Sequence, residues 1–382
     1  MTEQDFIKNC KEKGLTDTQA EHCLDLYKYS KDIEWSFEKA KLNFNESQMK
    51  EARLAFKDGL TKEQVEVFYK PEFSKYQMWE VLKAFKNGLT VEQIEFFYRK
   101  EFNASKMEQA RLAFKNGLIK EHAEVFYKQE FDCFQMEQAR LAFENGLTAA
   151  QVAFFYKPEF DASQMQQAHF AFEHGLTIEQ VELFYKQESD EHRMEQARLA
   201  FEHGLTIEQV RLFYKQEFTE YQMHEAREAL EHGLTEEHIE LFYRKEFDKR
   251  QMHEVIQDLR DGATVEQIKI FYKPEFYSVQ MHETYLALKD GLTREQIEFF
   301  YKPEFKWRQM HEAYLALKNG LDMEHIKVFY KPDFTCEQMQ QARLALENGS
   351  TIEQVKEILG IVEDSNPSPE VKNSTALMEF FN

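Results

Sequence analysis

Hydrophobic residues recur with helical spacing along most of the chain. In the stretch 74–102, SKYQMWEVLKAFKNGLTVEQIEFFYRKEF, the residues Met78, Val81 and Ala84 fall on one stripe of a helical wheel. We expect this stripe to face a second helix and the protein core. No stretch alternates between apolar and polar residues as a strand does, so the pattern predicts an all-α protein.

Polar residues mark the expected ends of the helices. Ser74 with Gln77 forms a predicted capping box, which starts a helix, and Gly88 can take the left-handed conformation that ends it. Thr90 with Gln93 predicts a second, shorter helix. The first pair has counterparts at Asn45/Gln48, Asp132/Gln135, Asp161/Gln164, Thr219/Gln222, Asp248/Gln251 and Thr335/Gln338. Each such stretch is therefore predicted to form a helical hairpin.

The glycines indicate a tandem repeat. Eleven of them follow one another at steps of 29 residues: Gly59, Gly88, Gly117, Gly146, Gly175, Gly204, Gly233, Gly262, Gly291, Gly320 and Gly349. The stretches 172–181 and 201–210 even read the same, FEHGLTIEQV. Isolated helices this short are marginal in water, so neighbouring hairpins have to supply the missing burial. The sequence predicts an α-solenoid of eleven 29-residue helix-turn-helix repeats over residues 45–363.

The two ends depart from the repeat. Residues 1–44 contain a glycine followed by a capping pair, at Gly14, Thr16 and Gln19, but out of phase with the repeat. We expect this region to form a helical N-terminal cap, a degenerate repeat. Residues 364–382 are predicted to be a disordered or docking C-terminal tail, because a polar, proline-containing stretch precedes a final apolar ALMEFFN.

Two motifs give the chain a family resemblance. The residues that carry them are Gln48, Met49, Glu51, Arg53, Gln135, Met136, Arg140, Asn145, Gly146 and Leu147. In its Gln-Met-x-Glu-x-Arg and Asn-Gly-Leu motifs the stretch 45–363 resembles uncharacterised bacterial tandem helical-hairpin repeat proteins, and more distantly tetratricopeptide-type scaffolds. The resemblance implies the architecture and no activity. Because the repeat is shorter than a tetratricopeptide, no ligand-binding residue is carried over.

Charge narrows the classes of partner. The formal net charge is −21, from 48 Lys and Arg against 69 Asp and Glu. Such a chain repels phosphate backbones, so nucleic acid is not an expected partner.

The start of the chain lacks the apolar segment of a signal peptide, and no window is apolar enough to span a membrane. Four scattered cysteines without a CxxC pair fit a reducing compartment. We expect a cytoplasmic monomer without a membrane partner.

No pattern for catalysis or for a cofactor is present. The motifs GxSxG and GxGxxG and the Walker loop are missing, and paired carboxylates carry no signal in so acidic a chain. His224, His253, His282 and His311 form a row at equivalent places of successive repeats. Neighbouring helices lie about 8–10 Å apart, whereas each ligand of one zinc ion lies about 2 Å from it. We therefore predict no enzyme, no cofactor and no metal site.

One pair of places is predicted to join neighbouring repeats. We number the places within each repeat so that Asn45 and Ser74 are place one of their repeats. An arginine at place nine and a glutamate or glutamine at place seven then lie on opposite flanks of the first helix. The arginines are Arg53, Arg111, Arg140, Arg198, Arg227 and Arg343. When repeats stack, these flanks meet. A structural contact between repeats is favoured over anion binding.

The remaining face of the first helix varies most, and we predict that it binds a partner. It holds places two, three, six, ten and thirteen. The residues predicted to bind are Tyr76, Trp79, Phe134, Phe170, Tyr221, His224, Arg250, His253, His282, Trp307, Arg308 and His311. The aromatic and arginine residues among them are typical interaction anchors, in two zones joined by nearly uniform repeats. Apolar residues at place ten, such as Leu112, fit two interpretations equally well: they belong to the binding face, or they pack against the next repeat.

These patterns favour a non-catalytic protein–protein interaction scaffold or inhibitor. One alternative is an acidic nucleic-acid mimic that blocks a nucleic-acid-binding protein. A second is an RNA-binding protein that reads one base per repeat, because places two, three and six vary as such a code requires. That alternative lacks a basic groove, since positive side chains on the face are few.

Overall fold

The computed structural model describes residues 2–361, which form 25 α-helices and no strand. The predicted all-α class is confirmed at this level. Contacts divide the chain into two compact units, Met1–Met223 and His224–Asn382, and each is described by itself. The C-terminal tail predicted over residues 364–382 lies outside the described residues.

The first unit begins with three helices that do not follow the later pattern. They are α1 (Glu3–Glu12), α2 (Asp17–Ser30) and α3 (Ile33–Ala40), and α2 contacts both of the others. Phe6, Cys10 and Leu15 pack with Ala20 and Cys23 in a small core between these helices. Helices therefore occupy the region for which a helical cap is predicted.

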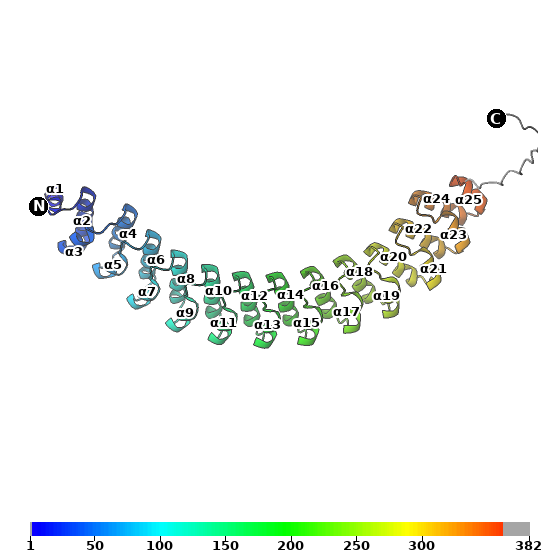
Figure 1. Cartoon of the computed structure of the whole chain (residues 1–382), viewed down its shortest axis with the longest axis horizontal. Coiled ribbons are helices and arrows are strands. Elements are labelled where there is room, and N and C mark those ends of the chain that lie inside the picture. The colour runs from blue at the N-terminus through cyan, green and yellow to red at the C-terminus, as the bar shows by residue number, and fades with distance from the viewer. Residues whose placement is uncertain (1, 362–382) are drawn as a thin grey trace, which may run out of the picture. The chain divides into compact units, whose positions relative to one another are not determined.

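From α4 onward, 12-residue and 7-residue helices alternate. In the first unit the longer helices are α4 (Glu46–Lys57), α6 (Lys75–Lys86), α8 (Ala104–Lys115), α10 (Cys133–Glu144), α12 (Ala162–Glu173) and α14 (Glu191–Glu202). The shorter helices are α5 (Lys62–Phe68), α7 (Val91–Phe97), α9 (Lys120–Phe126), α11 (Ala149–Phe155), α13 (Ile178–Phe184) and α15 (Ile207–Phe213). Within this unit the longer helices form one row and the shorter ones a second row (Figure 1).

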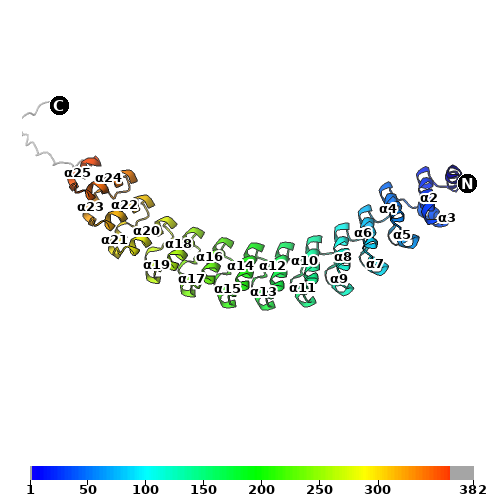
Figure 2. The ribbon, with the colours of Figure 1, turned by 180° about the vertical axis from the view of Figure 1, so that it is seen from behind.

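The second unit continues the alternation, and the boundary between the units falls inside α16 (Glu220–Glu231). Its further long helices are α18 (Lys249–Arg260), α20 (Ser278–Lys289), α22 (Trp307–Lys318) and α24 (Cys336–Glu347). The short helices are α17 (Glu236–Phe242), α19 (Val265–Phe271), α21 (Arg294–Phe300), α23 (Met323–Phe329) and α25 (Ile352–Ile358). Each long helix from α18 to α22 contacts the next long helix, and the row can be followed from behind in Figure 2.

The predicted caps determine where helices start and end. The backbone N–H of Gln77 donates to Ser74 Oγ at 3.3 Å, and that of Ser74 donates to Gln77 Oε1 at 2.8 Å, so α6 starts in a full capping box. The helix ends at Lys86, and Gly88 takes φ +79° two residues later. The predicted bounds of the first helix are confirmed here.

The capping glutamine also makes a bond that its local pattern does not predict. Gln77 Nε2 donates to the carbonyl oxygen of Phe102 at 2.7 Å, 25 residues further along the chain. Gln135 and Gln251 make the same bond, at 2.6 Å, to Phe160 and Phe276. One buried side chain therefore caps the long helix and holds the turn that leads into the next hairpin.

Tyrosines join several of the hairpins to the preceding one. Tyr98, directly after α7, donates its hydroxyl to the carbonyl oxygen of Phe68 at 2.6 Å and stacks on Phe73 with ring centroids 3.8 Å apart. The same hydroxyl–carbonyl bond joins Tyr127 to Phe97, Tyr156 to Phe126, Tyr185 to Phe155, Tyr214 to Phe184 and Tyr330 to Phe300. At these six tyrosines, neighbouring hairpins thus share aromatic rings whose buried hydroxyl groups are hydrogen-bonded, whereas the hydroxyl of Tyr301 makes no hydrogen bond.

The predicted contact between places nine and seven is confirmed in four cases. Nε of the arginine donates to Glu or Gln on the preceding long helix in the pairs Arg111–Glu80 (2.7 Å), Arg140–Gln109 (2.9 Å), Arg198–Gln167 (2.9 Å) and Arg343–Glu312 (2.8 Å). Arg53 instead pairs with Asp25 of α2 at 2.8 Å, because α2 takes the place of a preceding hairpin. Burial of the four arginines that contact Glu or Gln makes that contact structural, as expected.

Candidate partner-binding surface

Most of the predicted aromatic anchors are exposed on the first half of a long helix. Tyr76 is 60% exposed, Trp79 49%, Phe134 64% and Trp307 40%. Large rings on the same helices are otherwise half-buried or buried, as at Phe85 and Phe114. The N-terminal halves of the long helices therefore present a surface that differs from the interior face of the same helices.

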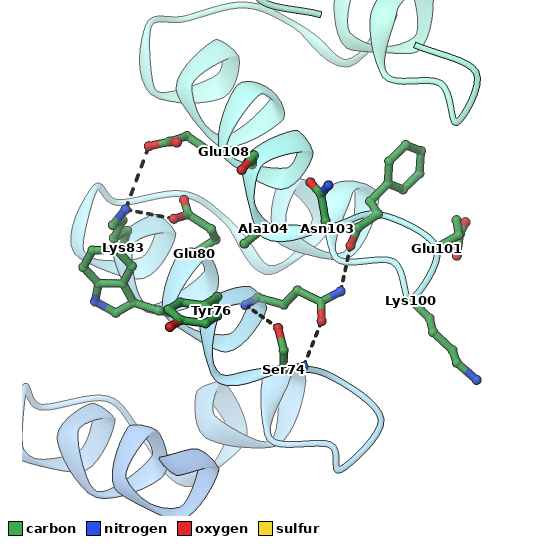
Figure 3. Close-up of a pocket in the computed structure, with 13 residues that line it drawn as sticks. Ser74, Tyr76, Glu80, Lys83, Lys100, Glu101, Asn103, Ala104 and Glu108 are labelled. Carbon is green, nitrogen blue, oxygen red and sulfur yellow. Dashed lines mark hydrogen bonds and ion pairs between the residues drawn. The ribbon is translucent and has the colours of Figure 1, made fainter. Parts of the chain in front are cut away.

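Tyr76 and Trp79 line a surface hollow of about 780 Å³ in the first unit. Helix α6 forms one wall and the turn before α8, with Asn103 and Ala104, forms the other (Figure 3). The Lys83 ammonium lies 3.6 Å from the centre of the Trp79 ring, 2.8 Å from Glu80 and 3.9 Å from Glu108. The rim thus carries both signs of charge beside an apolar wall.

Trp307 and Arg308 line a second hollow, of about 820 Å³, in the second unit. The Arg308 guanidinium lies over the Trp307 ring at 5.3 Å. Tyr277 and Val279 line the same hollow, and Tyr277 is 76% exposed. The sequence analysis missed Tyr277 because it stands at place one, where a capping residue is expected. The sequence feature that could have indicated Tyr277 is an aromatic residue where most repeats have the capping residue Ser, Thr, Asp or Asn.

The other predicted anchors do not line either hollow. Phe134 and Arg250 are exposed on the first turns of α10 and α18. Tyr221 is exposed on the first turn of α16. Phe170 is only half-buried at place ten, and the Arg198 guanidinium lies 5.8 Å from its ring. Of the predicted anchors, Tyr76, Trp79, Trp307 and Arg308 therefore line the two hollows, and the others lie apart from them.

Place ten is mixed in character. Leu54 and Leu344 are exposed, whereas Leu112 and Leu141 are half-buried. Packing against neighbours therefore accounts for part of this row. The hollows are lined by the first half of a long helix and by the turns that precede long helices, with Lys83 at place ten added in the first hollow.

The histidine row is paired with glutamates, which the sequence analysis did not foresee. His253 Nδ1 lies 2.9 Å from Glu225, and His311 Nδ1 lies 2.9 Å from Glu283, each on the preceding long helix. The hydrogen bond to Glu283 raises the pKa of His311 above its ordinary value. His224 lies 3.3 Å from Glu228 of its own helix. His253 and His311 therefore join helices as the arginines do elsewhere, whereas His224 pairs within its own helix.

His282 meets two carboxylates rather than one. Glu254 and Asp258 of α18 both approach its Nδ1, and the three ligand atoms lie within 4.8 Å of one another. No metal ligand was expected in this row, because successive histidines lie too far apart to share one ion and His224 with Glu228 lacked an evident third ligand. This cluster combines one histidine with acids from a neighbouring helix.

The four cysteines differ in burial. Cys10 and Cys23 are buried in the N-terminal helices, Cys133 and Cys336 are half-buried, and all four are free thiols. Burial, together with the neighbouring Cys10, raises the pKa of the Cys23 thiol to about 12. That thiol stays protonated and unreactive at neutral pH.

Comparisons add no relative to these observations. No family model matches the chain, and neither a curated protein nor a solved structure matches it. Among residues 2–361, no helix has the length and apolar character needed to cross a membrane.

Proposed function

We propose that the chain is an α-solenoid of eleven 29-residue helix-turn-helix repeats that binds another protein and catalyses no reaction. The repeated glutamine–carbonyl and tyrosine–carbonyl bonds support this architecture, because each hairpin uses them to hold its neighbour. Exposed residues that neither make these bonds nor pack in the core can vary without loss of the fold. The places that vary most lie on the first half of the long helices.

The gathering of exposed aromatic residues in two hollows carries the proposal. Trp79 with Tyr76, and Trp307 with Tyr277, present large rings to solvent beside charged side chains. Aromatic and arginine residues in hollows are the usual energetic centres of protein interfaces. A purely structural repeat gains nothing from such exposure, since burial of each ring would stabilise it by roughly 1.5–3 kcal/mol.

The rims indicate the chemistry of the partner. The first hollow carries Lys83 and Lys100 together with Glu101 and Glu108, and the second combines basic and acidic side chains in the same way. A mixed rim around an apolar centre matches the polar rim and apolar core of a protein interface. It does not match a phosphate polymer, which requires a predominantly basic groove.

The proposal is tested by capture from the lysate of the native host with tagged chain, read by mass spectrometry. We expect one protein to be enriched both with and without nuclease. Its capture should persist at raised salt, because apolar anchors are weakly screened. A double variant, Trp79→Ala with Trp307→Ala, should lose capture by at least about tenfold, as loss of two hot-spot residues predicts.

A matched control separates the hollows from exposed apolar surface in general. Ile119 and Ile178 are exposed at the starts of short helices, away from both hollows. The variant Ile119→Ala with Ile178→Ala should capture the partner as well as the unchanged chain does. Equal capture by the tryptophan variant, at unchanged helicity, would refute the hollows as the binding surface. Recovery that vanishes with nuclease would refute a protein partner.

A further inference from the structure

Asp258 occupies a place that every other repeat fills with alanine. The equivalent residues are Ala55, Ala84, Ala113, Ala142, Ala171, Ala200, Ala229, Ala287, Ala316 and Ala345. Asp258 is 1% exposed, so its carboxyl group lies in the interior between helices. Ten repeats fold with alanine here, so the hairpin does not need the carboxyl group. A buried carboxylate destabilises a fold unless it is paired, which makes a specific role the better explanation.

Two further ligand-type side chains meet Asp258. Glu254 lies one turn earlier on α18, and His282 lies on the neighbouring helix α20. His282 Nδ1 is 2.7 Å from Glu254 Oε1 and 3.6 Å from Asp258 Oδ1. The three ligand atoms lie within 4.8 Å of one another. The hydroxyl of Tyr272 donates to the other oxygen of Asp258, which holds the carboxyl group in place.

The Nδ1 atom of His282 is enclosed and makes no hydrogen bond. The Glu254 oxygen is close to it but does not lie in the direction that an N–H bond requires. The equivalent atoms of His253 and His311 do make hydrogen bonds, to Glu225 and Glu283. His282 therefore differs from its two neighbours in the row at the one repeat interface where an additional carboxyl group is present. A ring nitrogen that is enclosed, makes no hydrogen bond and lies beside two carboxylates is the arrangement that a cation would complete.

Two of the three residues of the cluster border a hollow that opens to solvent, while Asp258 lies behind them. Glu254 and His282 line a hollow of about 390 Å³, together with Val279, Glu283 and Trp307. An ion can enter by this route, and a coordination position can face it. The hollow adjoins Trp307, one of the exposed aromatic residues of the candidate partner-binding surface.

We propose that Glu254, Asp258 and His282 bind one divalent transition-metal ion, with zinc as the best fit. Imidazole nitrogen with carboxylate oxygens suits zinc and related first-row ions, whereas magnesium and calcium prefer oxygen ligands alone. Three protein ligands leave a position for water or for a group from a partner. Tyr272 supplies the outer hydrogen bond that such sites use to orient a ligand. The site does not depend on the proposed partner, because its three ligands come from this chain.

The test is a zinc titration of the full chain after removal of metals with a chelator, followed by isothermal calorimetry without any partner. We expect one zinc ion per chain. The single variants Glu254→Gln, His282→Gln and Asp258→Asn should each weaken binding by about tenfold or more, because each removes one of three ligands. Cobalt in place of zinc should give visible absorption bands, and magnesium should give no heat.

Two matched controls keep the result interpretable. His253→Gln removes a histidine at the equivalent place of the preceding repeat, where Ala229 stands in the position of Asp258, and should bind zinc as the unchanged chain does. Asp258→Ala installs the residue of the other ten repeats, so it should fold normally and still lose zinc. Circular dichroism of each variant checks the fold. The proposal is overturned if the unchanged chain binds no zinc, or if His253→Gln and His282→Gln weaken binding equally.

Discussion

At the scale of the residue, the burial of Asp258 makes the stability of the fold depend on pH. Burial raises the pKa of its carboxyl group to about 7; the Tyr272 hydrogen bond opposes this rise, Glu254 adds to it, and His282 opposes it. The group is ionised in the unfolded chain above about pH 4. In the folded, metal-free chain it stays largely protonated until about pH 7. The folded state therefore binds more protons than the unfolded state between these two pH values.

This difference predicts the direction of a pH effect. The contribution of Asp258 to the free energy of unfolding should fall as pH rises from about 4 to about 7, and stay low above that. In the presence of chelator, Asp258→Asn should be more stable than the unchanged chain at about pH 8, by on the order of 2–4 kcal/mol, with a smaller gain near pH 5. Urea unfolding at both pH values measures it. A variant that is destabilised at both would contradict the assignment.

Individual residues also decide how neighbouring hairpins are joined. Arg111 and Arg140 reach back to place seven of the preceding repeat, which the sequence spacing predicts. In the second unit His253 and His311 make the equivalent contact from place six. The spacing did not predict that histidine at place six makes the contact that arginine makes elsewhere, because a row of histidines is equally typical of a solvated face.

At the scale of the element, capping glutamines such as Gln135 have two tasks in the long helices, whereas those of the short helices have one. Gln135 caps α10 through Oε1 and donates Nε2 to the carbonyl of Phe160 at 2.6 Å. Gln151 caps α11 through Oε1 in the same way, but its bonds stay within the capping box. The glutamine of α10 therefore both caps its helix and binds the following turn, whereas the glutamine of α11 only caps its helix.

Replacement by glutamate separates the two tasks. Gln135→Glu keeps the accepting oxygen of the cap and removes the buried N–H donor, which leaves the Phe160 carbonyl without its partner. We expect a loss of about 1–3 kcal/mol in the free energy of unfolding. Gln151→Glu keeps the whole capping box, so the loss there should stay below about 0.5 kcal/mol. Urea unfolding of both variants at neutral pH checks this, and equal losses would show that the bond to Phe160 contributes nothing.

At the scale of the whole molecule, contacts are made between successive helices. Within the first unit, α6 contacts α8, α8 contacts α10, and α10 contacts α12. In an array of this kind, stability is the sum of hairpin terms and nearest-neighbour terms. One hairpin should therefore be removable if the phase of the repeat is kept.

The identical stretches 172–181 and 201–210 permit such a deletion without a new sequence at the junction. Removal of residues 172–200 should leave helicity per residue unchanged and unfolding still cooperative. Removal of residues 172–196 has a similar size but shifts the phase, so it should lower helicity and stability. Circular dichroism and thermal unfolding compare the two. If both deletions behave alike, the neighbour-by-neighbour architecture proposed for the chain is refuted.

The sequence by itself determined the helical class, the bounds of the long helices and the arginine contact between repeats. These features follow from local chemistry, such as the Ser74 capping box and Gly88, or from a spacing that recurs from repeat to repeat. The exposure of Trp79 and Trp307 was predictable for the same reason, since both lie off the apolar stripe.

Only the tertiary structure decided which exposed residues share a hollow and which polar residues meet. Tyr277 joins Trp307, and Asp258 joins His282, across a gap of more than twenty residues in the chain. Such meetings depend on how far one helix is turned and shifted against its neighbour, and a periodic pattern leaves both quantities open. For that reason the histidine row looked alike in sequence, whereas His282 alone among His253, His282 and His311 lies between two carboxylates in the fold.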